Sequence, residues 1–423
     1  MEDLYNSNFV FSKNVRFIEN GDKIIIINGK SGIWGFIDKS TLDKLNYCID
    51  NKISPLAFIK ALKNQEEMQK IGELFQVLIE EKMIKKPNDE KFKVNIKLVE
   101  FKMTNRCNLK CLHCGVSADA NAVDSLDTKD IKTILDKIFK LNIETLFLTG
   151  GEPLLRKDIK LILSYIKENF KGKVELITNA TLINSEIADL LRKCVHSISI
   201  SADGYDKNSI DFIRGQGVYD KIIKAVNYLK NAGFKKDELS LTMTCTYQNI
   251  DHQEEFTMLC DKLNVQSKLR EFTPIGRGLK NNNKIGVNNY LLNEKETDND
   301  FENIREELEC TIVCTGGISK FMINEYGDMY PCITLEREEY KFGNILKDDL
   351  NSLFNSKKYE EFIKNKIQKS IVDTLPKCKD CKVRYFCMDS CLGISNSHYK
   401  NKEICEERCN QIRPYLSKIL WNE

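Results

Sequence analysis

Cysteine is the residue that most constrains how this chain folds. The 423 residues contain 16 Cys, and nine of them lie between residues 301 and 423. A disulfide scaffold is typical of short exported chains, whereas residues 1–9 show no charged segment that leads into a long apolar run. With only four His in the chain, thiolates are the main ligands available for metal. We therefore expect reduced, metal-binding cysteines in a cytoplasmic protein.

Composition and charge exclude two classes of partner. Lys plus Arg is 64 and Asp plus Glu is 62, so the chain carries no bulk positive charge for nucleic acid. No run of about 18 apolar residues is present, so we expect no membrane-spanning helix. The expected partners are therefore neither a nucleic acid nor a membrane.

Residues 1–86 are predicted to form a small domain of three strands followed by three helices. Asn20-Gly21 and Asn28-Gly29 are hairpin signals that bound strands near 15–19, 23–27 and 33–37. Ser40 is a predicted helix cap, and Ser54-Pro55 is a cap followed by Pro at the first helical position. A third helix is expected at 66–82. The order of elements indicates a winged-helix-like domain.

Residues 95–280 alternate β-rich runs with amphipathic helical patterns. The six predicted strands are 97–103, 143–148, 173–177, 196–200, 239–245 and 267–272. Such alternation predicts an α/β fold, a parallel sheet curled into a partial barrel, with its site at the carboxyl ends of the strands. Residues 281–309 are predicted to be a polar connector. Residues 310–423 are expected to form one Cys-rich domain. They show little apolar periodicity outside 351–366, so metal is expected to supply part of their folding energy.

Three cysteines follow the first predicted barrel strand at CxxxCxxC spacing: Cys107, Cys111 and Cys114. Three thiolates can hold three irons of a [4Fe–4S] cluster and leave the fourth iron open; the alternative is a zinc knuckle. The motif resembles the signature of the radical S-adenosylmethionine (SAM) enzymes, which have a partial (β/α)6 barrel. That resemblance implies that the open iron binds SAM and that the reduced cluster cleaves it to a 5′-deoxyadenosyl radical.

Further residues match this family in order along the chain, and the resemblance implies their roles at SAM. Gly150, Gly151 and Glu152 stand where the family binds the SAM amino group. Ser201 and Asp203 resemble its ribose contacts, and Arg214 resembles its carboxylate contact. His113 stands where a ring lies near the adenine, and Asn179 closes the third strand. A surface polar role is the alternative for Asn179, Ser201, Asp203 and Arg214. The segment 274–278 also resembles the family, without an assigned role, and no catalytic residue is assigned.

The C-terminal cysteines resemble the seven-cysteine SPASM extension of radical SAM enzymes. That resemblance implies two auxiliary [4Fe–4S] clusters, three clusters in all. One would be held by Cys378, Cys381, Cys387 and Cys409, and the other by Cys314, Cys332 and Cys391, with Cys310 as an added candidate. Cys405 departs from the pattern and could compete with either assignment. Taken alone, the same spacing also fits zinc ribbons. Cys48, Cys194, Cys245 and Cys260 are predicted to be core thiols.

Together these features resemble a radical SAM/SPASM maturase of ribosomal peptides, with residues 1–86 similar in arrangement to precursor-recognition domains. The resemblance implies a precursor peptide as partner, its leader bound by residues 1–86 as an added strand, and a low-potential electron donor such as ferredoxin or flavodoxin. The segments that flank the cysteine triad, 104–106 and 115–118, resemble those of maturases of Cys-rich peptides. That resemblance favours thioether formation between a Cys sulfur and a carbon. Carbon–carbon crosslinking, epimerisation and sulfatase maturation are alternatives. The opposed class is a zinc-ribbon, winged-helix regulator.

Overall fold

The computed structural model describes residues 2–87, 92–286, 305, 308, 310, 312–387, 391–393 and 402–422. The predicted connector, 281–309, lies largely outside them. The chain forms two compact units. The first contains Met1–Lys93, Tyr290–Cys314 and Ile367–Glu423, and the second contains Val94–Asn289 and Thr315–Lys366. No helix in the described part of the chain has the length and apolarity needed to cross a bilayer.

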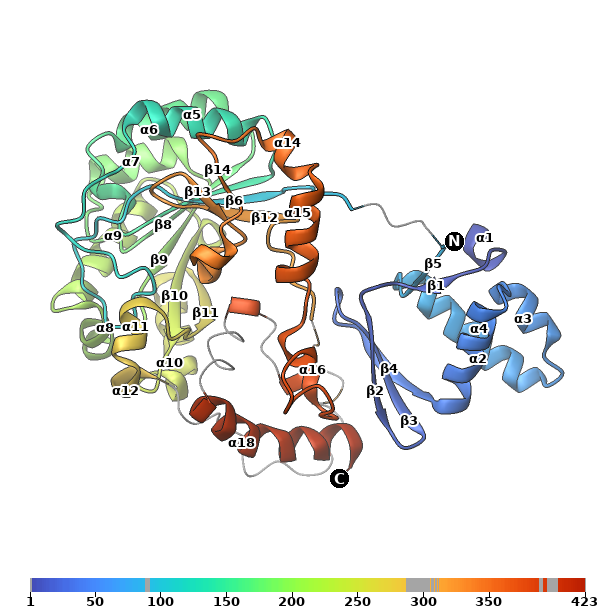
Figure 1. The fold of residues 1–423 in the computed structure, drawn as a ribbon. Helices are drawn as coiled ribbons and strands as arrows, with labels where there is room; N and C mark the ends of the chain where they lie inside the picture. The colour runs from blue at the N-terminus through green and yellow to red at the C-terminus, as the bar shows by residue number, and fades with distance from the viewer. Residues whose placement is uncertain are drawn as a thin grey trace. The chain divides into compact units, whose positions relative to one another are not determined.

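The second unit is built on a curved, largely parallel sheet (Figure 1). Its strands β6 to β11 lie side by side in chain order, all parallel, with the following bounds: Leu98–Lys102, Thr145–Thr149, Lys173–Thr178, Ser197–Ser201, Leu239–Cys245 and Gln266–Glu271. The helices between them lie outside the sheet: α5 (Thr128–Phe139), α6 (Ile159–Asn169), α7 (Ser185–Cys194), α8 (Lys207–Arg214), α9 (Val218–Asn231) and α10 (Gln253–Leu263). All six predicted barrel strands are confirmed.

Part of the Cys-rich C-terminal region extends this sheet. Strand β12 (Lys320–Ile323) pairs parallel with β6, and β13 (Asp328–Tyr330) and β14 (Gly343–Asn344) follow antiparallel. Residues 310–423 were expected to form one domain, whereas in the structure 315–366 belongs to the barrel unit and 367–423 to the other.

Apolar packing holds residues 315–366 together, and the pairing of β12 with β6 joins them to the barrel unit. Phe321 is buried in β12, and its ring lies 5.9 Å from that of Phe354 in α14 (Leu350–Phe354). Tyr359, in α15 (Lys357–Phe362), lies 5.2 Å from the rings of both Phe342 and Phe354. This part of the region therefore has an aromatic core, and the expectation that residues 310–423 depend on metal does not extend to it.

In the first unit, a short helix α1 (Glu2–Tyr5) and strand β1 (Val10–Phe11) precede an antiparallel sheet, ordered β2-β3-β4, and the helices α2 to α4. The strands are Val15–Asn20, Lys23–Asn28 and Trp34–Asp38. The helices α2 (Lys39–Asp50), α3 (Pro55–Ala61) and α4 (Gln65–Glu80) are capped by the side chains of Asp38, Ser54 and Asn64. The predicted strands and helices are therefore present, but Asp38 rather than Ser40 caps the first helix.

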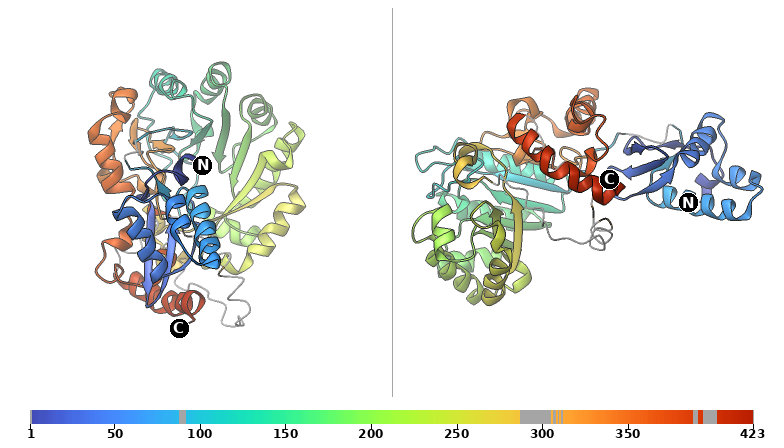
Figure 2. Two further views of the ribbon diagram at one scale, coloured as in Figure 1. Left: turned by 90° about the vertical axis from the view of Figure 1, so that its right-hand side faces the viewer. Right: turned by 90° about the horizontal axis from the view of Figure 1, so that it is seen from below.

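The central strand β3 is buried on both faces because another layer covers each. Ile26 packs with Leu45 of α2 and Phe75 of α4. Ile25 and Ile27, on the opposite face by strand alternation, belong to a core that includes Ile412, Leu416 and Ile419 of α18 (Lys402–Trp421). Figure 2 shows α18 beside the sheet. The N-terminal sheet and the C-terminal cysteine-bearing segment are thus parts of one core.

Candidate functional site

A cavity of about 270 Å³ opens where β6 to β10 end. It brings together most of the residues predicted to hold the first cluster and SAM: Cys107, Cys111, His113, Cys114, Gly150, Gly151, Asn179, Ser201 and Arg214. The two remaining predicted residues, Glu152 and Asp203, are buried beside it without lining it. Chain order along a parallel sheet explains the gathering, because each residue follows or ends a neighbouring strand.

The cysteine triad fits three ligands of a [4Fe–4S] cluster. Cys107 and Cys111 are buried and Cys114 is partly exposed, and all three line the one cavity. Burial raises the pKa of Cys111 to about 11, so the thiol keeps its proton until a cation displaces it. Nowhere in the described chain do three His, Cys, Asp or Glu converge on a point as a single metal ion requires. The three thiols border one cavity, as the ligands of one cluster would.

The segment 274–278, which had no predicted role, holds the cysteine loop. Arg277 donates from Nη1 to the carbonyl of Cys111 (3.1 Å) and from Nη2 to that of Ala118 (2.6 Å). Gly276 has a φ of +56°, and a Cβ there would stand 2.1 Å from the carbonyl oxygen of Gly115. The backbone therefore approaches the loop more closely than any side chain allows.

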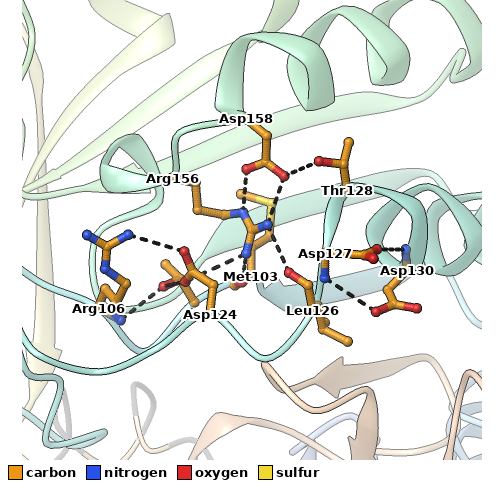
Figure 3. Close-up of polar contacts among 10 residues, drawn as sticks. Met103, Arg106, Asp124, Leu126, Asp127, Thr128, Asp130, Arg156 and Asp158 are labelled. Carbon is orange, nitrogen blue, oxygen red and sulfur yellow. Dashed lines mark hydrogen bonds and ion pairs between the residues drawn. The ribbon is translucent and has the colours of Figure 1, made fainter.

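A second anchor is the buried guanidinium of Arg156, which follows the Gly150–Pro153 motif (Figure 3). It donates to the carbonyls of Met103 and Leu126, each at 3.0 Å, and pairs with Asp158 at 2.9 Å. Asp124, 3.7 Å from Arg156, also pairs with Arg106 at 3.3 Å. Arg156 thus connects the end of β6, immediately before the cysteine loop, with the segment after β7.

Glu152 is held by hydrogen bonds from its own chain. It is fully buried, and it accepts hydrogen bonds from Thr178 Oγ1 (2.8 Å), the Leu154 amide (3.1 Å) and the Asn179 amide (2.8 Å). Burial raises its pKa despite these donors. In the structure Glu152 fixes the backbone at the end of β8, and its contact with a SAM amino group remains a prediction.

Asp203 joins His113 and Arg214 behind the cavity wall. The Asp203 carboxylate lies 2.9 Å from His113 Nε2 and is ion-paired with the Arg214 guanidinium. Burial disfavours its charge, but Arg214 and His113 outweigh burial and hold the pKa of Asp203 well below its usual range. Arg214 Nη1 also lies 3.8 Å from Cys111 Sγ. The three side chains therefore orient each other, and their predicted SAM contacts remain predictions.

The cavity also includes residues that sequence reasoning missed. Thr244 lies near the end of β10, and its position at the carboxyl end of a barrel strand was a usable signal. Phe272, Thr273 and Ile275 follow β11, and Ile275 lies in the segment 274–278. Thr334, after β13, carries no sequence signal. These additional residues line the same cavity.

A second cavity lies within the first unit and is lined by five cysteines: Cys378, Cys381, Cys387, Cys405 and Cys409. Burial, and to a smaller extent the charges of the four other thiols, raise the pKa of Cys378 to about 11. Four of the five are the predicted ligands of one auxiliary cluster, and this donor set fits a [4Fe–4S] cluster.

The other predicted cluster cysteines do not line this cavity. Cys310 is buried in the core that contains Ile25, its Sγ donates to the Tyr385 carbonyl (3.2 Å), and burial raises its pKa to about 12. It is placed as a core thiol. Cys314 and Cys391 belong to the first unit and Cys332 to the second, so their common cluster remains a prediction. Of the expected core thiols, Cys48, Cys194 and Cys260 are buried and Cys245 is partly exposed.

Comparison with known proteins gives two family matches. The model of the Radical SAM superfamily matches residues 101–260, and the SPASM model, an iron–sulfur cluster-binding domain, matches residues 314–382. The chain therefore belongs to the radical SAM enzymes that carry a SPASM domain. Its cofactors are SAM and several [4Fe–4S] clusters.

Individual relatives are more distant. Mycofactocin maturase MftC of Mycolicibacterium smegmatis is 27% identical over 59% of this chain and 67% of the relative. The subtilosin biosynthesis protein AlbA of Bacillus subtilis is 26% identical over 74% and 71%. An AdoMet-dependent heme synthase of Nitratidesulfovibrio vulgaris is 23% identical over 75% and 94%. Streptococcus suis SuiB, solved with its precursor peptide SuiA, shares the fold (TM-score 0.52, 17% identity, 93% and 97% covered).

Proposed function

We propose that this enzyme modifies a ribosomally made, Cys-rich precursor peptide by joining Cys sulfurs to peptide carbons through thioether bonds. The observation that carries a peptide substrate is an edge strand with a groove beside it. Strand β4 pairs with β3 on one side and ends the order β2-β3-β4. The maturase MftC, the biosynthesis protein AlbA and the SuiB complex with its peptide support the same class of substrate.

The groove fits an extended peptide. It has a volume of about 540 Å³ and lies between β4, α4 and the end of α18, all within the first unit. Phe36, Ile37 and Leu74 give it apolar surface, and Lys70 and Arg305 give it positive charge. An added strand would gain main-chain hydrogen bonds from the edge and contacts for alternate side chains from the groove. We propose that the leader of the precursor binds here.

The barrel residues would prepare the other substrate. When bound, the cluster on the cysteine triad supplies reductive cleavage of SAM to a 5′-deoxyadenosyl radical. Gly150 and Gly151 allow SAM to approach the backbone, while Asn179 and Ser201 offer polar groups. Phe272 and Ile275 provide an apolar wall that limits water. None of these residues selects the carbon that reacts, so the position of the bound peptide would select it.

Thioether formation is the chemistry favoured by the flanks of the triad, 104–106 and 115–118, which resemble those of Cys-rich peptide maturases. Each crosslink removes one hydrogen from a carbon and one from a thiol, which is a two-electron oxidation. One electron leaves with the hydrogen atom that the deoxyadenosyl radical abstracts, so a second electron must leave the site by another route. We propose an auxiliary cluster as its first acceptor and a ferredoxin or flavodoxin as the low-potential donor, in the cytoplasm. The three-strand, three-helix domain favours this reading over sulfatase maturation.

The test first looks for a short Cys-rich precursor among the reading frames beside the gene and then incubates that peptide anaerobically with reconstituted enzyme, SAM and dithionite. A thioether product is lighter by two hydrogens per crosslink and has fewer thiols for iodoacetamide. The same mass loss with every thiol still alkylated means a carbon–carbon bond, and unchanged mass with solvent deuterium at an α-carbon means epimerisation. Either result rejects the thioether proposal.

Leader binding is tested with matched substitutions on α4. Leu74 lines the groove, whereas Val77, one turn along the same helix, is 47% exposed and does not line it. Leu74→Glu should weaken peptide binding in fluorescence anisotropy at least tenfold, and Val77→Glu should leave it unchanged. Equal affinities of the two variants would contradict leader binding in this groove. Deletion of residues 1–86 is a poor test, because it would expose the core shared with α18.

A further inference from the structure

The five-cysteine cavity of the first unit holds one thiol more than a [4Fe–4S] cluster needs. Cys378, Cys381 and Cys387 come from one short segment, and Cys405 and Cys409 come from α18. A [4Fe–4S] cluster with no open iron takes four cysteine thiolates, one for each iron. The segment supplies three, so α18 has to supply one of its two.

Helix geometry gives the two α18 cysteines nearly equivalent positions. Residues four apart lie on the same face of a helix, with Cβ atoms about 5–6 Å apart. Cys405 and Cys409 are both partly exposed and both line the cavity.

A cysteine of the same unit that is not placed for ligation looks different. Cys310 is 1% exposed, and its thiol donates to a backbone carbonyl. It is absent from the lining of the cavity. Cys405 differs from it in exposure and position, because Cys405, like Cys409, is partly exposed and lines the cavity.

We propose that Cys405 and Cys409 are interchangeable fourth ligands of the auxiliary cluster whose other ligands are Cys378, Cys381 and Cys387. Either thiolate completes the cluster, and the other remains beside it as a thiol. Loss of one α18 thiol through oxidation or alkylation then leaves the cluster in place. This inference concerns the cluster alone and is independent of the peptide chemistry proposed above.

The variants Cys405→Ser, Cys409→Ser and the double variant test it after anaerobic reconstitution. Iron and sulfide per chain and the electron paramagnetic resonance of the reduced clusters are measured against wild type. Cys260→Ser, a buried thiol in α10 of the other unit, is the control. Each single variant should keep the wild-type iron content, and the double variant should lose one cluster. Loss of a cluster in either single variant overturns the proposal.

A measurement on the unaltered enzyme covers the case in which a variant does not fold. The reconstituted protein is treated with iodoacetamide without oxygen, and labelling is read residue by residue by mass spectrometry. Both Cys405 and Cys409 should be labelled in part, their occupancies together approaching one thiol per chain. Full labelling of Cys405 with full protection of Cys409, or the reverse, shows a fixed ligand and overturns the proposal.

Discussion

Replacing Gly276 with Ala should displace the cysteine loop, and two separate costs contribute. A left-handed backbone costs an L-residue about 1–2 kcal/mol, and Gly276 has a φ of +56°. The added methyl would also stand 2.1 Å from the Gly115 oxygen and 2.8 Å from the Cys114 oxygen, both of them backbone atoms. Overpacking of this kind costs about 1–3 kcal/mol. The expected total is about 2–5 kcal/mol.

Two other glycines of the same unit separate the costs. Gly217 has a φ of +76°, and a Cβ added there would meet nothing within 4 Å, so its Ala variant should show only the backbone cost. A Cβ at Gly151 would stand 2.2 Å from the Arg106 oxygen without a left-handed φ, so its Ala variant should show only the steric cost. Free energies of unfolding from urea titration of the three variants test this partition.

Iron content then tests the consequence for the site. Because the loop bears Cys107, Cys111 and Cys114, Gly276→Ala should lose one cluster's iron and SAM cleavage, and Gly217→Ala should lose neither. If Gly276→Ala is no less stable than Gly217→Ala and keeps all its iron, the close approach does not hold the loop. The assigned role of segment 274–278 would then be wrong.

Three further predictions concern the clusters and the buried charges. Ala at Cys107, Cys111 or Cys114 should abolish 5′-deoxyadenosine formation, measured by chromatography, while auxiliary iron remains; persisting cleavage in all three would refute the assignment. Asp203→Asn leaves the buried Arg214 charge unpaired and should cost about 3–5 kcal/mol in urea unfolding, whereas Asp261→Asn, which breaks an exposed pair with Lys236, should cost less than about 1 kcal/mol. Chelating the iron should speed hydrogen exchange of the β3 amides. Arg384, between Cys381 and Cys387, donates to the Phe17 carbonyl of β2 at 2.8 Å, and β2 pairs with β3. Unchanged exchange would show that the sheet is independent of the cluster.

Local signals predicted the elements of the fold well. The two Asn-Gly pairs, the Ser54-Pro55 cap and the alternation of strands with amphipathic helices each act within a few residues, and the structure contains the corresponding elements. The cysteine spacing likewise predicted the triad beside one cavity. These local signals do not identify which other element packs against each surface, because that element is far away in the sequence.

The run Lys23–Asn28 shows where more could have been inferred. Four consecutive Ile in a strand imply burial on both faces, and a winged-helix-like domain with helices on one face covers only one. A second layer was therefore implied, although its identity was not. The structure identifies it as α18, at the other end of the chain.

Asp203 and Glu152 show a different limit. The motif positions predicted both as ligand contacts, but a motif does not say which polar groups are already bonded to protein. Glu152 accepts three hydrogen bonds from its own chain, and Asp203 neutralises Arg214 and contacts His113. A buried carboxylate must have such partners to remain charged. The same carboxylates that would face SAM therefore also fix the residues around it, and a substitution at either changes the shape of the site before it changes any contact with the cofactor.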